Sequence, residues 1–223
     1  MRIAILTEGD GEFKALPRLY PQLREAIPRS TILRPLKVAT TPYAAPGTIA
    51  QQCISRLTIA KSQQADRFIL LLDREQQDKC SGVIADSISS QIIKKISLPP
   101  KSLYVVLKDR TFENWLIADP DALRSQRARF RLTVAFERAA GRGGSDRADA
   151  LSLLKAVAVG SDYDKIEDAD RICARQSIGK VASNSRSFRH FLHAIGHPDY
   201  QDQCRQPVRV DDTQPASRRA RRG

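Results

Sequence analysis

Residues 68–75 read FILLLDRE, an unbroken apolar run that ends in Asp73-Arg74-Glu75. A run without polar alternation is typical of a strand buried on both faces, as in the centre of a parallel sheet. Helical patterns separate it from three further predicted strands, which are residues 3–6, 31–38 and 103–107. Pro35 weakens the second of these and favours a place at the sheet edge. The alternation predicts an α/β fold with an open, mainly parallel sheet flanked by helices.

After residue 110 the pattern becomes helical and more basic. Apolar spacing predicts helices over residues 112–118, 133–140, 151–159, 172–178 and 187–195. We therefore expect an α/β domain over residues 1–110 and a helical extension, packed on it, over residues 111–200. Residues 201–223 offer little to bury, and they predict a disordered basic tail.

The charge balance is the first indication of function. The 223 residues include 37 Lys and Arg against 25 Asp and Glu, which gives a net charge of +12. This excess favours a nucleic-acid partner, because basic side chains displace the counterions of phosphates. A basic surface that serves only solubility is the alternative. The clearest cluster, expected to contact phosphates, is Arg218, Arg219, Arg221 and Arg222; a solvated end without a partner is the alternative for these four.

Other patterns argue against several classes of protein. No apolar run approaches the roughly 20 residues that span a bilayer. The opening residues, MRIAILTEGDGE, lack the long apolar region of a signal peptide. We therefore expect a cytoplasmic protein without a membrane partner. Neither GxGxxG nor GKS/T follows the first strand, which argues against dinucleotide-binding and P-loop folds.

Cysteine and histidine patterns do not predict zinc. The four cysteines form no CxxC pair, so neither a zinc ribbon nor a disulfide framework follows from them. His190, His193 and His197 recur at helix-like spacing. Gly196 and Pro198 are expected to end that helix before the three rings align as ligands.

Acidic residues follow the two strongest predicted strands. Glu8 comes after residues 3–6, and Asp73 ends the central run. If these strands are parallel neighbours, both carboxylates reach the same sheet edge, and Glu75 points the same way if the chain stays extended. Converging carboxylates favour a hard divalent cation, Mg²⁺ or Mn²⁺. The alternatives are that Glu8 only complements a helix dipole and that Asp73 only pairs with Arg74 at the surface.

Three residues around the last predicted strand extend this hypothesis. Glu113 opens the following helix, and we expect it to be a ligand of a second metal ion. Lys108 and Arg110 flank the end of the strand, where their charges would hold a phosphate, Lys108 in the catalytic step and Arg110 in nucleic-acid binding.

The order of these elements resembles the Toprim domain of bacterial primases, topoisomerases and OLD-type nucleases. A strand is followed by Glu8-Gly9 and a helix, and a later strand ends in an acid-x-acid pair, over about residues 1–110. The resemblance implies a Toprim-like sheet in which Glu8 transfers protons. It also implies that Asp73 and Glu75 hold Mg²⁺, with Glu75 standing where the usual residue is Asp.

Two later elements resemble an uncharacterised bacterial family, domain of unknown function 4276. The first is Glu-x-Trp-Leu-x-Ala-Asp, and the second is Ser-x-Ser-Phe near the C-terminus. The matching residues are Glu113, Trp115, Leu116, Ala118, Asp119, Ser185, Arg186, Ser187 and Phe188. The resemblance covers about residues 1–196 and implies a Toprim-like metal nuclease that accompanies an ATPase in phage defence. We expect the tryptophan itself to lie in the core.

Together these observations predict a Mg²⁺- or Mn²⁺-dependent nuclease that acts on DNA, with RNA as the alternative substrate. The family resemblance adds the expectation of a role in antiviral defence with an ATPase partner. The main alternative is a catalytically inactive Toprim-like subunit that binds nucleic acid within an ATPase complex, and Glu75 in place of Asp supports it. Nucleotidyl transfer ranks last, because 223 residues contain no second, polymerase-like domain. The sequence leaves the oligomeric state open.

Overall fold

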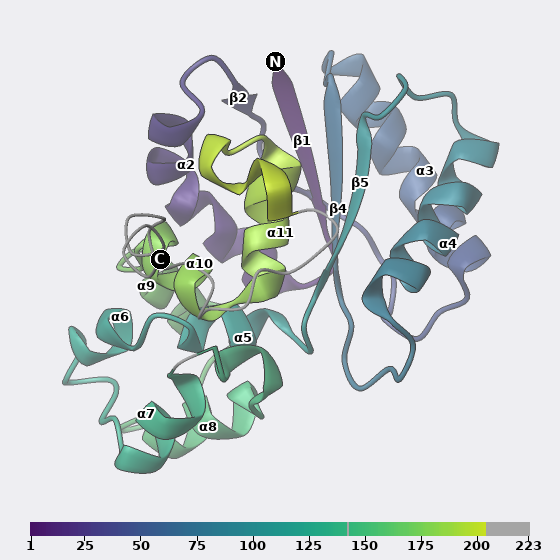
Figure 1. Cartoon of the computed structure of the whole chain (residues 1–223). Coiled ribbons are helices and arrows are strands. Elements are labelled where there is room, and N and C mark those ends of the chain that lie inside the picture. The colour runs from purple at the N-terminus through teal and green to yellow at the C-terminus, as the bar shows by residue number, and fades with distance from the viewer. Residues whose placement is uncertain (142, 204–223) are drawn as a thin grey trace, which may run out of the picture.

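The apolar run around residue 70 forms an interior strand of a parallel sheet (Figure 1). The computed structural model describes residues 1–141 and 143–203. The strand order is β2–β1–β4–β5, with β3 also paired to β1. The strands are β1 (Arg2–Thr7), β2 (Thr31–Ile32), β3 (Leu36–Lys37), β4 (Arg67–Asp73) and β5 (Leu103–Lys108). The predicted α/β fold with an open parallel sheet is confirmed.

The segment predicted as one strand over residues 31–38 is instead two short strands. β2 pairs with the start of β1, and β3 pairs with its end, both in parallel. Pro35 lies between them, and its missing N–H interrupts the ladder. The expected edge position is confirmed, because both strands lie on the outer side of β1.

Helices cover both faces of the sheet (Figure 1). α3 (Pro46–Ser62) and α4 (Ser81–Lys95) cover one face. α1 (Asp10–Ala15), the 3-10 turn η1 (Leu16–Leu19) and α2 (Tyr20–Ala26) lie on the other. The C-terminal part adds α5 (Phe112–Ile117), α6 (Pro120–Arg124), α7 (Val134–Ala140), η2 (Ser145–Arg147), α8 (Ala150–Val157), α9 (Glu167–Cys173), α10 (Ile178–Asn184), α11 (Arg186–Ile195) and η3 (Pro198–Gln203).

The helix predicted over residues 172–178 is wrong. α9 ends at Cys173 and α10 begins at Ile178, with a turn between them. Gln176 is buried in this turn, and its side-chain nitrogen donates to the carbonyls of Trp115 (2.8 Å) and Leu116 (3.2 Å). A polar side chain that must reach another helix therefore sets the break, and apolar spacing does not reveal it.

Alternating side chains divide the buried residues into two clusters. Leu70 and Leu72 face α3 and α4, whereas Ile69 and Leu71 face the other helical layer. The cluster that contains Ile69 and Leu71 also includes side chains from β1, β5 and the helices α5 to α11. The predicted extension therefore packs on the sheet through a shared core, while its boundary at residue 110 stays a prediction.

Two further predictions concern the C-terminal part. α11 ends at Ile195, where Gly196 adopts a left-handed conformation (φ 88°), so His197 lies beyond the helix as expected. The disordered tail predicted from residue 201 begins too early, because residues 201–203 are the end of η3. Residues 204–223, with the arginine cluster Arg218, Arg219, Arg221 and Arg222, lie outside the described residues. Within residues 1–141 and 143–203, no helix has both the length and the apolar character needed to cross a membrane.

Candidate active site

Strand register places polar side chains at the carboxyl edge of the sheet. Asp73 and Lys108 are direct cross-strand partners at the ends of β4 and β5. Because side chains alternate, both continue the row of Leu71 and Val106 on the face that α1 covers. Thr7 ends β1 in the same row. In open parallel sheets this edge is where ligands bind.

The short helix α1 completes the group from above this edge. Glu8 follows β1, and Glu12 lies one helical turn later, so both point back toward the strand ends. Lys108 Nζ lies 2.5 Å from Glu12 Oε2 and 2.9 Å from Asp73 Oδ1. The lysine is 0% exposed and Glu12 is 1% exposed. We call Glu8, Glu12, Asp73 and Lys108 the acid–lysine cluster.

The electrostatics of the acid–lysine cluster depend on burial first. Burial raises the pKa of Glu8 to about 8 and that of Glu12 to about 7, against the opposing charge of Lys108. The negative charge of Asp73 adds to both increases. Burial on its own would lower the pKa of Lys108, but Asp73, Glu12 and Glu8 outweigh it and raise that pKa. One ammonium thus faces three carboxyl groups.

Several oxygens in or beside the acid–lysine cluster have no hydrogen-bond partner among the described residues. They are Thr7 Oγ1, Glu8 Oε2 and Glu12 Oε1, and all are buried. A buried polar atom without a partner costs about 1–3 kcal/mol. The donor set therefore suits a proton or a further cation in addition to Lys108.

Glu75 was expected to point the same way as Asp73, but it does not continue that row of side chains. β4 ends at Asp73, and Glu75 turns into a left-handed conformation (φ 56°) while its N–H donates to the carbonyl of Arg110 at 2.8 Å. Arg110 turns in the same way (φ 68°). Two facing turns, rather than an extended chain, thus close the ends of β4 and β5. The prediction that the chain stays extended from Asp73 to Glu75 is therefore wrong.

Glu75 nevertheless remains within electrostatic reach of the site. Burial raises its pKa, the charges of Asp73 and Glu113 raise it further, and Lys165 opposes them. Glu113 is 7% exposed in the first turn of α5. Across the described ranges, no group of three or more His, Cys, Asp or Glu side chains is arranged to hold a metal ion. The structure therefore does not assemble Asp73, Glu75 and Glu113 into a three-ligand site.

Sequence reasoning missed Glu12, although a signal was present. Glu12 stands four residues after Glu8 and three before Ala15, on the side of α1 that faces the sheet. An acid at that position of an inward face needs a buried cation. Lys108, identified only as a phosphate-binding residue, is that cation.

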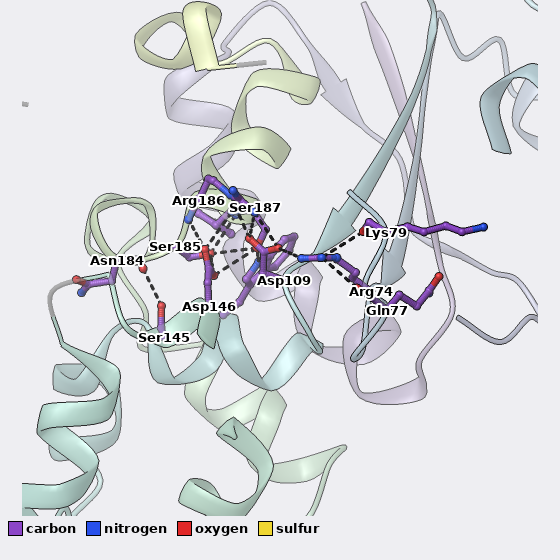
Figure 2. A network of polar contacts seen from close by, with 12 residues as sticks. Arg74, Gln77, Lys79, Asp109, Ser145, Asp146, Asn184, Ser185, Arg186 and Ser187 are labelled. Carbon is purple, nitrogen blue, oxygen red and sulfur yellow. Dashed lines mark hydrogen bonds and ion pairs between the residues drawn. The ribbon is translucent and has the colours of Figure 1, made fainter. Parts of the chain in front are cut away.

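A second polar network begins at the residues next to the acid–lysine cluster (Figure 2). Arg186 binds Asp109 through both Nη2 (2.8 Å) and Nε (3.2 Å). Arg74 Nη1 lies 3.5 Å from the same carboxylate and Arg74 Nη2 donates to the carbonyl of Gln77 at 3.0 Å. The network thus joins both strand ends to the start of α11.

Asp146 extends this network and holds the first turn of α11 (Figure 2). Its carboxylate accepts from the Arg186 N–H at 2.6 Å and from the Ser185 hydroxyl at 2.7 Å. Burial and then the charge of Asp109 raise the pKa of Asp146 to about 6, against these hydrogen bonds. Ser185 also caps α11 by accepting from the Phe188 N–H at 3.1 Å.

The two elements noted around residues 113–119 and 185–188 meet in the core. Trp115 Nε1 donates to Ser187 Oγ at 2.8 Å, and the tryptophan ring packs edge-on against Phe188 at 5.0 Å. Asn184 donates to the Ala118 carbonyl at 2.8 Å. Trp115 is buried, as expected. The two elements therefore pack together in the core, and Glu113 acts electrostatically on Glu75.

Comparison with known proteins identifies a family. A family described as Domain of unknown function (DUF4276) matches residues 7–196, a range that includes the acid–lysine cluster and both core elements. No curated protein and no solved structure matches the chain. Because the family match spans most of the sequence, the chain belongs to the DUF4276 family.

Proposed function

We propose that this protein is a metal-dependent nuclease that hydrolyses phosphodiester bonds, with DNA as the preferred substrate. The observation that carries the proposal is the acid–lysine cluster at the carboxyl edge of a parallel sheet. Phosphodiester hydrolysis needs a group that moves protons near neutral pH and positive charge near the phosphate. The net charge of +12 supports a polyanionic substrate.

The donor set fits a divalent cation. Glu8 Oε2 is buried without a partner, and Asp73, at 18% exposure, opens toward solvent. Mg²⁺ binds through one or two carboxylates and keeps waters or substrate phosphates as its other ligands, so no group of three carboxylates is required. Asp73 would hold the ion, with Glu75 and Glu113 at the rim, while Glu8 would stay free to transfer protons. When bound, the ion would supply Lewis-acid stabilisation of the phosphate charge.

The protein's own groups have separate roles in this proposal. Glu8 is half-buried with a pKa of about 8, which suits proton transfer near neutral pH. Lys108 is completely buried, so it is a positioning residue that fixes Asp73, in place of the expected phosphate contact. Phosphate contact falls to Arg110 and Lys165, which reach solvent beside Glu75.

Cleavage of plasmid, single-stranded DNA and RNA with Mg²⁺ or Mn²⁺ tests the proposal. We expect Asp73→Asn and Glu8→Gln to lower the rate by about 100-fold or more, as removal of an acid–base or metal-binding group does. Asp86→Asn, an exposed acid on α4, is the matched control and should cleave normally. Titration of Mn²⁺ by calorimetry should show weaker binding by Asp73→Asn. Full activity in both site variants would refute the site.

A second candidate is a catalytically inactive subunit that binds nucleic acid beside an ATPase. One observation favours it: Lys108 already places a cation between Glu12 and Asp73, where it neutralises part of the acidic charge. This reading predicts nucleic-acid binding without cleavage under any metal, alone or with the ATPase. It also predicts that Asp73→Asn leaves binding unchanged.

A further inference from the structure

A cavity of about 640 Å³ lies on the outer side of α1, away from the acid–lysine cluster. Its walls come from α1, η1, α2 and the segment that contains β2 and β3. Phe13, Pro17, Tyr20, Ile32 and Pro35 supply a largely apolar lining. This volume lies within the usual range for small-ligand pockets, about 300–1,000 Å³.

Two arginines line the same cavity, each against an aromatic ring. The guanidinium carbon of Arg34 lies 5.9 Å from the centre of the Phe13 ring. That of Arg24 lies 5.8 Å from the centre of the Tyr20 ring. Both arginines are exposed. An aromatic and apolar wall with guanidinium groups beside it is the combination that binds the bases and phosphates of single-stranded nucleic acids.

The charge of these arginines is not neutralised by the protein. No carboxylate of the described part of the chain lies within ion-pair distance of Arg24 or Arg34. The two other charged side chains of the cavity do have partners, because Lys14 pairs with Glu167 and Asp10 pairs with Lys37. The cavity therefore presents two positive charges to an anion.

The cavity adjoins the candidate active site through two segments. α1 directs Glu12 toward the sheet, while Phe13, the next residue, lines the cavity. Ile166 closes another side, and its neighbour Lys165 influences the charge of Glu75. A nucleic-acid strand that crosses α1 would thus reach both the cavity and the candidate active site.

We infer that this cavity binds one nucleotide of a single-stranded nucleic acid, with the base against Phe13 and the flanking phosphates at Arg24 and Arg34. The inference rests on the proposed function and deepens it, because it gives the substrate a single-stranded segment beside the scissile bond. A base paired and stacked within a duplex does not present its face to such a wall.

Binding of a short oligothymidylate that carries one 2-aminopurine tests the inference, in EDTA so that no cleavage occurs. We expect base fluorescence to be quenched on binding, and Phe13→Leu to remove the quenching and weaken affinity about fivefold or more. Arg24→Gln combined with Arg34→Gln should lower the log–log salt slope by about 1.4, since each phosphate contact on single strands contributes about 0.7. Both arginines are exposed, so this variant is expected to fold.

The matched control is Arg127→Gln combined with Arg138→Gln, which removes two exposed arginines from the region of α6 and α7. It should keep the quenching and the salt slope of the wild type. Equal binding by all variants would overturn the inference. It would also be overturned if thymidine monophosphate bound as tightly as the oligonucleotide, because the cavity would then be a site for free nucleotides.

Failure of the inference about the cavity can be distinguished from failure of the proposed nuclease function. Quenched binding that Phe13→Leu abolishes, in a protein that cleaves nothing with any metal, would refute the nuclease and support the cavity. If cleavage depends on Asp73 but binding is unchanged by the Phe13 and arginine variants, the nuclease is supported and the cavity is refuted.

Discussion

Lys108 keeps an ammonium group where solvent does not reach it, and the two carboxylates within 2.9 Å make this possible. Its Nζ also lies 5.8 Å from the centre of the Phe112 ring. Replacing only one partner of such a buried pair leaves an uncompensated charge, whereas replacing both can be nearly neutral.

The variant Lys108→Met is therefore expected to lower the free energy of unfolding by about 3 kcal/mol or more at neutral pH. Adding Glu12→Gln should recover part of that loss, since one of the buried carboxyl groups left without a cation can then no longer carry a charge. Urea unfolding of the two single variants and the double variant measures this. Strictly additive losses would show that the ion pair does not link the two residues.

Stability should also depend on pH through Glu8 and Glu12. Their pKa values rise from 4.5 to about 8 and about 7 in the folded protein, chiefly through burial. The folded state thus binds more protons than the unfolded state between pH 4.5 and 8, and the free energy of unfolding falls as pH rises through this window.

Urea unfolding in EDTA at several pH values should show this decline, and Glu12→Gln should flatten it because one of the two groups no longer titrates. Identical pH profiles for the variant and the wild type would contradict the assignment to Glu12.

At the scale of elements, α1 depends on a close approach that only glycine permits. A Cβ at Gly11 would lie 2.1 Å from the carbonyl oxygen of Lys165, in the segment before α9. That backbone contact sets the distance between α1, which carries Glu12 and Phe13, and the C-terminal helices.

Gly11→Ala is expected to destabilise the protein by about 1–3 kcal/mol, since α1 must shift away from α9. The same shift should lower both cleavage and oligonucleotide binding. Gly47→Ala is the control, because a Cβ at Gly47 in α3 meets nothing within 4 Å. Thermal unfolding of both variants measures the effect; an equal response at the two positions would contradict it.

Much of the element order could be predicted, and the reasons are local. Unbroken apolar runs identify β1, β4 and β5, and parallel strands necessarily bring Glu8, Asp73 and Lys108 to one edge. The left-handed turn at Glu75 was not predictable, because no glycine or asparagine marks it. The break before α10 and the burial of Glu12 depend on contacts with residues more than 60 positions away.

At the scale of the whole molecule, the sheet and the C-terminal helices share one hydrophobic cluster. The cluster on the α1 face of the sheet contains side chains from before and after residue 110 in the sequence, among them Ile5, Leu71, Trp115 and Phe188. Without the later helices, α1, η1 and α2 would cover only part of this face, and the rest would be open to water.

A fragment of residues 1–110 should therefore unfold without a cooperative transition, whereas a fragment of residues 1–203 should unfold cooperatively. Circular dichroism during urea unfolding distinguishes the two, because loss of the shared core removes the sharp transition. A sharp transition with a similar midpoint in the shorter fragment would show that the predicted α/β domain is independent.

The hydrogen bond between Trp115 and Ser187 has a practical consequence. Trp115 is the only tryptophan of the 223 residues, and its ring lies 6.0 Å from the Phe112 ring. The ammonium of Lys108 in turn lies over the Phe112 ring. When tryptophan is excited selectively, the emission therefore comes from one fluorophore, whose indole N–H donates to Ser187 of α11. Its wavelength and intensity provide a label-free signal for events at the sheet edge in rapid-mixing experiments.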